Sequence, residues 1–253
     1  MRIDVNCWLG FWPFQIDPAL SPAGLARQLA AEGISRACVS ATESILCPDP
    51  HLPSRRLLLR LKSQPSLVPV PTIDPSLGGW RDCLAAYDAA GFGRAVKIIP
   101  NYHRYELDAP CVDELVTALT GRPARVLMVQ MRVEDERQHY PLMKVPGVSA
   151  EGVIALANKY PSLRIICLCA YLREAEQHVS GTENVWVDTA FIEYMDTIRH
   201  TLDRIPANRL LFGSHTPFLY TRANAIKLDA SGAPKRALNA IAYGNVRRLL
   251  RGR

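Results

Sequence analysis

The sequence has no long hydrophobic run, and no stretch approaches the 18 apolar residues that would span a bilayer. The first residues, Met-Arg-Ile-Asp-Val-Asn, contain no apolar signal core, so we expect an unexported cytoplasmic protein with no membrane partner. Cys-x-x-Cys pairs are also absent: the seven cysteines are dispersed, which favours reduced thiols over a disulfide scaffold. No zinc-finger spacing, RNP-like aromatic motif or long basic run accompanies the net charge of +6, so we expect no nucleic-acid partner.

What the chain does contain is an alternation of short apolar runs with longer segments of helical spacing. With 253 residues, 48% of them hydrophobic, the length suits one domain over residues 1–253. The predicted strands are 2–6, 36–40, 67–74, 95–100, 124–131, 164–169, 184–190 and 210–215. The predicted helices are 21–32, 52–63, 79–90, 111–120, 149–160, 171–179, 195–205 and 235–251.

This pattern predicts an α/β fold of the (β/α)8 TIM-barrel type. A doubly wound sheet would need fewer strands, and no Gly-x-Gly-x-x-Gly follows the first strand. In a barrel the site lies where the strands end and their loops begin. Because side chains alternate along a strand, the members of each of three pairs should share one face of their strand: Asn6 and Trp8, Gln130 and Arg132, and Cys167 and Cys169.

Six separated segments carry a resemblance to a known family. They are Ile-Asp-Val-Asn-Cys-Trp-Leu-Gly at the first strand, Ala-Val-Lys-Ile-Ile-Pro at 95–100, Tyr-Glu-Leu-Asp-Ala-Pro at 105–110, Asn-Val-Trp-Val-Asp at 184–188, Arg-Leu-Leu-Phe-Gly-Ser-His-Thr-Pro-Phe at 209–218 and Gly-Asn-Val-Arg-Arg-Leu-Leu at 244–250. In this order they resemble the amidohydrolase superfamily, in its amidohydrolase-related (metal-dependent hydrolase) branch. The resemblance implies a TIM barrel whose strand ends hold a divalent metal that activates water.

The metal-binding positions of that family are all changed. Where the resemblance implies two histidines on the first strand, one each on the fifth and sixth and an aspartate on the eighth, this chain has Asn6, Trp8, Gln130, Cys169 and His215. Tryptophan offers no ligand atom and neutral amides are poor ligands, so we expect no metal and no other cofactor. Two alternatives stay open for Cys169: a different metal site formed with His215 and Asp188 or Cys7, or a buried apolar side chain.

Two residues are predicted to be catalytic. Lys97, near the end of the fourth strand, is interpreted as a fixed cation or, if desolvated, as an amine nucleophile or base; the alternative is an ion pair with Asp188 or Asp74. His215 is the strand-end residue whose ordinary pKa suits proton transfer near neutrality, although a histidine that only caps the end of a strand is also common.

Five further residues are predicted to bind substrate. Arg132 can hold a carboxylate through its planar guanidinium, so the expected ligand is small and anionic. Polar side chains at other strand ends complete the predicted set: Asn6, Gln130, Asp188 and Asn101.

The sequence therefore predicts a hydrolase or lyase that acts on a small anionic or cyclic-amide substrate without the usual metal centre. The alternative is a catalytically inactive pseudoenzyme that binds a metabolite or a protein partner. Lys97, Gln130, Arg132 and His215 around an open cavity would favour the enzyme, whereas a mouth plugged by Trp8 would favour the scaffold. A homo-oligomer is compatible with either function.

Overall fold

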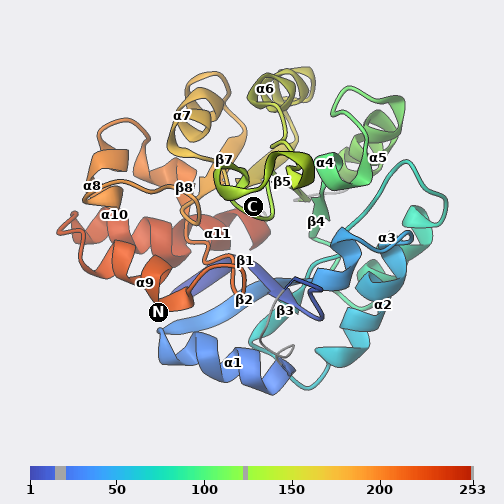
Figure 1. The fold of residues 1–253 in the computed structure, drawn as a ribbon, viewed down its shortest axis with the longest axis horizontal. Coiled ribbons are helices and arrows are strands. Elements are labelled where there is room, and N and C mark those ends of the chain that lie inside the picture. Colours follow the sequence, from blue (N-terminus) through green and yellow to red (C-terminus); the bar gives the residue numbers. More distant parts are fainter. Residues whose placement is uncertain (15–20, 122–124, 252–253) are drawn as a thin grey trace.

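The computed structural model describes residues 1–14, 21–121 and 125–251. Its strands run parallel and alternate with helices (Figure 1). The strands are β1 (Arg2–Leu9), β2 (Ile34–Ala41), β3 (Leu67–Pro69), β4 (Ala95–Ile98), β5 (Val126–Gln130), β6 (Arg164–Leu168), β7 (Val185–Asp188) and β8 (Leu210–Leu211). The α-helices are α1 (Pro22–Ala31), α2 (His51–Arg60), α3 (Trp80–Ala89), α4 (Pro100–His103), α5 (Pro110–Thr120), α6 (Ala150–Lys159), α7 (Leu172–Ser180), α8 (Thr197–Leu202), α9 (Thr221–Asp229), α10 (Lys235–Asn239) and α11 (Asn245–Arg251).

The strands form two sheets in the order β1-β2-β3 and β4-β5-β6-β7-β8, and single bridges join the two sheets. One bridge pairs Cys7 with Thr216, and the other pairs Thr72 with Lys97. Backbone hydrogen bonds support both seams, from Trp8 N to Thr216 O at 2.8 Å and from Ile73 N to Lys97 O at 2.8 Å. The predicted α/β fold of the (β/α)8 type is confirmed.

Two apolar layers hold the barrel together. Val5, Met128 and Ile166 belong to a buried cluster inside the barrel, which Val246 and Leu249 of α11 join from one end. A larger cluster lies between the strands and the surrounding helices, because alternate residues of each strand face outward. Burial of both strand faces explains why the strands read as nearly continuous apolar runs.

Strand β1 carries an irregularity that places its polar residues. Its pairing with β2 shifts register between Asp4 and Cys7. Within the shifted stretch Val5 packs inside the barrel, whereas Cys7 after it packs in the outer layer, and Asp4 accepts a hydrogen bond from the backbone of Asn6 at 2.9 Å. An extra residue of this kind redirects the following side chains, which turns Asn6 and Trp8 together toward the interior.

Several predicted boundaries differ from the structure. The predicted strands 67–74 and 210–215 are shorter, as β3 and β8, and position 124 of the predicted strand 124–131 lies outside the described residues. The predicted helix 235–251 is divided into α10, a π-helical turn η5 (Ala240–Gly244) and α11. Helices α4 and α9 were not predicted: α4 is a single turn, and the sequence of α9, Thr-Arg-Ala-Asn-Ala-Ile-Lys-Leu-Asp, shows no clear apolar stripe.

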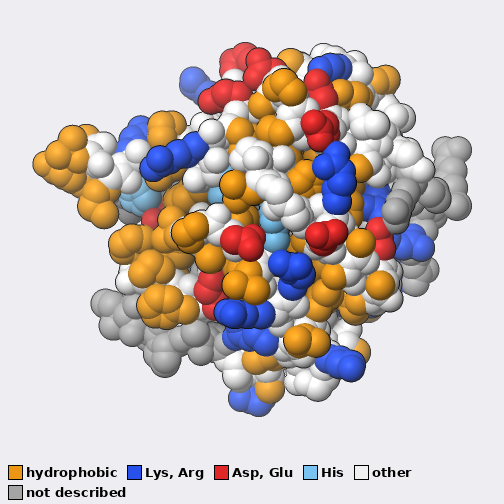
Figure 2. All heavy atoms as spheres, turned by 90° about the vertical axis from the view of Figure 1, so that its right-hand side faces the viewer, with side chains coloured by type: hydrophobic (Ala, Val, Ile, Leu, Met, Phe, Trp, Pro, Cys, Tyr) orange, Lys and Arg blue, Asp and Glu red, His pale blue; other side chains and the backbone are white. Residues whose placement is uncertain are grey.

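The loop after β5 crosses the front of the barrel as Figure 1 presents it. It contains two short 3₁₀ turns, η2 (Glu136–Gln138) and η3 (Pro141–Met143). Three large apolar side chains of this loop are exposed, Tyr140 at 66%, Leu142 at 87% and Met143 at 65%. Figure 2 shows hydrophobic side chains projecting at its left margin, on the side that faces the viewer in Figure 1. None of the described helices is long and apolar enough to cross a membrane.

Candidate functional site

Lys97 lies at the centre of the C-terminal end of the barrel, on β4. The amine donates a hydrogen bond to Asn6 Oδ1 at 3.2 Å and lies 3.8 Å from the centroid of the Trp8 ring. The side chain is 1% exposed, and burial lowers the pKa of Lys97 to about 8. The ion pair with Asp188 or Asp74 that the sequence left open is not formed, because the ion pairs of the described residues do not include Lys97.

Asn6 connects this amine to the neighbouring strands. Its amide nitrogen donates to Cys169 Sγ at 3.1 Å and to Asp188 Oδ2 at 3.1 Å. Asp188 accepts a further hydrogen bond from Cys169 N at 2.8 Å, and burial raises the pKa of Asp188 to about 6. Glycine is required at Gly213, since a Cβ there would lie 2.5 Å from Asp188 Oδ2.

Cys169 faces the interior in a way that alternation did not predict. The structure ends β6 at Leu168 and gives Cys169 a positive φ of 60°, so its thiol turns toward Asn6. Cys167 instead packs in the outer layer, and the prediction that the two cysteines share a face is wrong. Burial raises the pKa of the Cys169 thiol well above its ordinary value, which keeps it protonated.

His215 is a neutral residue with both ring nitrogens occupied. Trp8 Nε1 donates to His215 Nδ1 at 3.2 Å, which leaves Nε2 to donate to Val133 O at 2.6 Å. Burial lowers the pKa of His215 to about 3. The ring also stacks on Phe218 with 4.9 Å between centroids. In this closed arrangement both nitrogens of His215 are engaged, and the ring closes the mouth of the barrel.

Arg132 is engaged by a carboxylate of the chain itself. Its guanidinium donates to both carboxylate oxygens of Glu174, at 2.7 and 2.6 Å, and to Cys169 O at 2.6 Å. It also lies 3.7 Å from the centroid of the Tyr171 ring. Glu174 would have to be displaced before Arg132 could hold a ligand through the same atoms.

Gln130 and Asn101 bind the loop after β5. Gln130 Nε2 donates to Arg132 O at 2.6 Å, and Asn101 Nδ2 donates to Pro146 O at 2.9 Å. Gln130 Oε1 is buried and has no hydrogen-bond partner. Of the predicted site residues, Lys97, Asn6 and Asp188 thus form one connected cluster, while Gln130, Asn101 and His215 bind the loop after β5. Arg132, itself part of that loop, joins it to Glu174.

The donor atoms present do not fit a divalent metal. Among the described residues no group of three or more His, Cys, Asp and Glu side chains could hold one, so the alternative site of Cys169, His215 and Asp188 is not formed. The Trp8 indole nitrogen is a hydrogen donor, both His215 nitrogens are used, and the buried Lys97 ammonium would repel a second cation.

A surface cavity lies beside the closed mouth. It has a volume of about 650 Å³ and is lined by residues that follow β5, β6 and β7: Arg137, Tyr171, Leu172, Arg173, Glu174, Phe191, Glu193, Tyr194, His200 and Arg204. Phe191 separates it from the interior, because its ring lies 5.6 Å from that of His215. The sequence did not indicate Tyr171, Glu174 or Phe191, since all three follow strand ends without a recognisable motif.

No protein-family model and no curated protein matches this sequence. Solved structures do match over the whole chain. A 2,6-dihydroxybenzoate decarboxylase from Rhizobium is 14% identical with a TM-score of 0.76, covering 98% of both chains. A dihydroxybenzoic acid decarboxylase from Polaromonas, with bound manganese and the inhibitor 2-nitroresorcinol, is 16% identical with a TM-score of 0.72, covering 98% of this chain and 96% of its own.

An uncharacterized TIM-barrel protein from Bordetella bronchiseptica also matches, with 14% identity, a TM-score of 0.71 and 98% coverage of both chains. At these identities the likeness is one of fold. It agrees with the barrel fold that the resemblance to the amidohydrolase superfamily implied.

Proposed function

We propose that this protein is a metal-independent lyase that removes carbon dioxide from a small carboxylate bearing a carbonyl group, with the Lys97 amine as nucleophile. The observation that carries the proposal is the state of that amine: it is buried, its pKa is lowered to about 8, and its hydrogen-bond acceptor is a neutral amide. Similarity in fold to decarboxylases of small aromatic acids supports the reaction class. The substrate should be small, because Lys97 is 1% exposed and the cavity beside the closed mouth has a volume of about 650 Å³.

A lowered pKa makes Lys97 a usable nucleophile near neutrality. At pH 7.5 an amine with a pKa of about 8 is roughly one quarter unprotonated, against about one part in a thousand for an ordinary lysine. The free amine attacks the substrate carbonyl and water leaves, giving an iminium ion. The bond to the carboxylate breaks, carbon dioxide departs, and the electron pair moves to the iminium nitrogen. The resulting enamine carbon takes a proton from solvent, and water hydrolyses the imine to regenerate the amine.

Metal chemistry of the kind implied by the Polaromonas structure does not fit this site. The strand-end positions hold Asn6, Trp8, Gln130 and Cys169, with Lys97 directly beside the Trp8 ring. A cationic amine in the centre of the mouth stabilises negative charge on a carboxylate in its own right. We therefore take the reaction class from the structural neighbours and assign the chemistry to Lys97.

Substrate reaches Lys97 only if the mouth opens. The loop after β5 is the element suited to move, because η3 has no buried residue and three large side chains of the loop are exposed. Its contacts with the barrel include the hydrogen bond from His215 to Val133 O. The neighbouring cavity then serves as the entrance, and Arg173, which lines it, attracts an anionic substrate.

Trapping with borohydride tests the proposal. The protein is incubated with a panel of small β-keto acids, treated with sodium borohydride and examined by intact mass and peptide mapping. We expect a stable adduct on Lys97 and release of carbon dioxide from the same compound. Lys97→Arg, which keeps the charge but forms no imine, should lose both.

Lys227 provides the matched control. Burial also lowers its pKa, but its amine donates to the backbone oxygens of Thr189 and Ala190 and lies outside the cluster. Lys227→Met should retain the adduct. An adduct on Lys227, or none on Lys97 with any member of the panel, would contradict the proposal.

The second candidate function is the non-catalytic scaffold that binds a metabolite or a protein partner. The observation in its favour is the closed mouth, in which Trp8, Lys97 and His215 are at most 1% exposed. It predicts neither adduct nor carbon dioxide release. Hydrolysis of a cyclic amide has less support, because burial lowers the pKa of His215, the expected base, to about 3.

A further inference from the structure

A separate cavity opens at the opposite, N-terminal end of the barrel. Its volume is about 540 Å³, within the range of about 300–1,000 Å³ that is usual for small-molecule sites. It lies between the beginnings of β1, β2 and β4 and the last helix, α11. The lining residues are Met1, Ile3, Ser35, Arg36, Ala37, Cys38, Val68, Val70, Gly91, Phe92, Arg94, Ala95, Val246, Arg247 and Leu250.

The wall of this cavity is apolar and reaches into the barrel interior. Cys38, Val70 and Ala95 are at most 4% exposed and belong to the inner apolar cluster, while Val68 and Phe92 are half-buried. Burying the hydrocarbon part of a ligand against such a surface is favourable by about 25 cal/mol per Å². The cavity therefore suits a compound with an aliphatic or aromatic body.

The described charged residues of the cavity are all of one sign. Among them three arginines line it, Arg36, Arg94 and Arg247, and no aspartate or glutamate does. Arg94 donates to Leu250 O at 2.9 Å, which connects the start of β4 to α11. Guanidinium groups beside an apolar wall complement a molecule that has a carboxylate at one end and hydrocarbon at the other.

We propose that this N-terminal cavity binds a small amphipathic carboxylate, with the hydrocarbon body against Val70 and Ala95 and the carboxylate between Arg36 and Arg247. The site is independent of Lys97, because it lies at the other end of the same strands.

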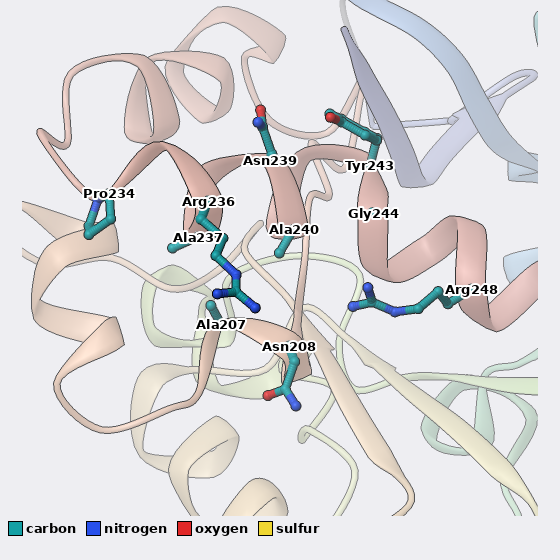
Figure 3. A pocket seen from close by; sticks show the side chains of 10 residues that line it. All are labelled: Ala207, Asn208, Pro234, Arg236, Ala237, Asn239, Ala240, Tyr243, Gly244 and Arg248. Atoms are coloured by element: carbon teal, nitrogen blue, oxygen red, sulfur yellow. The ribbon is translucent and has the colours of Figure 1, made fainter.

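A neighbouring cavity provides the control. It has a volume of about 490 Å³ and lies where η4 (Ala207–Arg209) meets α10, η5 and α11. Figure 3 shows Arg236 and Arg248 pointing into the same space above Asn208. Arg236 is exposed, as Arg36 is, and does not line the N-terminal cavity, so Arg236→Gln removes an equivalent charge from a different place.

Calorimetric titration with octanoate, below its micelle-forming concentration, tests the proposal. Acetate, which has the carboxylate without the long chain, and octanol, which has the chain without the carboxylate, are the comparison ligands. We expect octanoate to bind and each comparison ligand to bind at least tenfold more weakly. Arg36→Gln and Arg247→Gln should each weaken octanoate binding by roughly ten- to a hundredfold, the usual value of a charge-assisted hydrogen bond, while Arg236→Gln has no effect. Val68→Phe, which fills the cavity from a half-buried position, should abolish binding.

Lack of octanoate binding by the unmodified protein would overturn the proposal. So would equal losses in Arg36→Gln and Arg236→Gln, which would indicate general attraction to a basic surface, or unchanged binding in Val68→Phe. Circular dichroism of each variant separates these outcomes from a loss of folding.

Discussion

At the scale of single residues, the buried amine of Lys97 is costly to place. An ammonium group in an apolar interior loses its hydration, and a carboxylate partner usually compensates for that loss. Here the compensation is one neutral hydrogen bond to Asn6, the face of the Trp8 ring and the charge of Asp188, which does not contact the amine. A buried charge kept without an ion pair indicates a use for the amine, because a hydrophobic residue of similar size would be more stable there.

The stability of the protein should depend on pH through Lys97. Its pKa is about 8 in the folded state, below the ordinary value of 10.5, so the unfolded chain binds more protons between these two pH values. The free energy of unfolding should therefore rise with pH across this window, by about 3 kcal/mol relative to Lys97→Met, which has no such titration. Below pH 8 both states carry the charge and the difference between the proteins is constant.

Urea unfolding of the two proteins at pH 7, 8, 9 and 10.5 measures this effect. Subtracting the variant removes the contributions of other groups that titrate in the same range. Parallel curves for the two proteins would mean that the amine is solvated in the folded state, and the argument for its reactivity would fail with it.

At the scale of the elements, the sequence predicted the strands more successfully than the residues at their ends. Apolar runs identify β4 to β7 because both faces of a barrel strand are buried. Helix α9 lacks an apolar stripe, and the left-handed backbone at Cys169 depends on contacts far away in the sequence. Neither helix α9 nor the backbone conformation of Cys169 could therefore be predicted from the local sequence pattern.

Arg132 shows the same limit for a charged residue. The sequence indicated that Arg132 follows β5 and can bind a carboxylate. In the structure it does bind one, but that carboxylate belongs to Glu174 and not to a ligand. Glu174 lies 42 residues later, and no local spacing connects the two. With Arg132 paired internally, the expected effect of removing it moves from ligand affinity to stability.

Glu174→Gln should destabilise the protein by about 1.5–3 kcal/mol, because it removes the nearer of the two carboxylates from the guanidinium of Arg132, which is 1% exposed, and leaves only Glu136 at 3.7 Å. Glu193→Gln is the matched control: its carboxylate pairs with Arg137, and both side chains are more than half exposed, so the loss should be at most about 1 kcal/mol. Chemical denaturation of both variants measures the difference. Equal losses would show that the pair is solvated and that the loop after β5 is not anchored through it.

At the scale of the whole molecule, the barrel separates two ends of different character. The C-terminal end contains Lys97 beneath a closing loop, and the N-terminal end contains a cavity whose described lining has three arginines and no aspartate or glutamate. The inner apolar cluster lies between them. A ligand bound at one end therefore does not contact the residues of the site at the other end. Substitutions at the two ends should have additive effects on the free energy of unfolding.

The whole protein should also bind no manganese, in contrast to the Polaromonas decarboxylase of the same fold. The physical reason is the set of side chains at the site. Trp8 and His215 are hydrogen-bonded to each other, the Cys169 thiol is protonated, and the Lys97 ammonium beside the Trp8 ring would repel a metal ion. After dialysis against manganese chloride and removal of free ions, elemental analysis should give far less than one atom per chain. The melting temperature should not change, whereas a ligand at a hundredfold excess over its Kd would stabilise the folded state by about 2.7 kcal/mol. One manganese per chain, lost on Cys169→Ala, would mean that Cys169 is deprotonated by a metal in solution, and the assignment of the chemistry to Lys97 alone would be wrong.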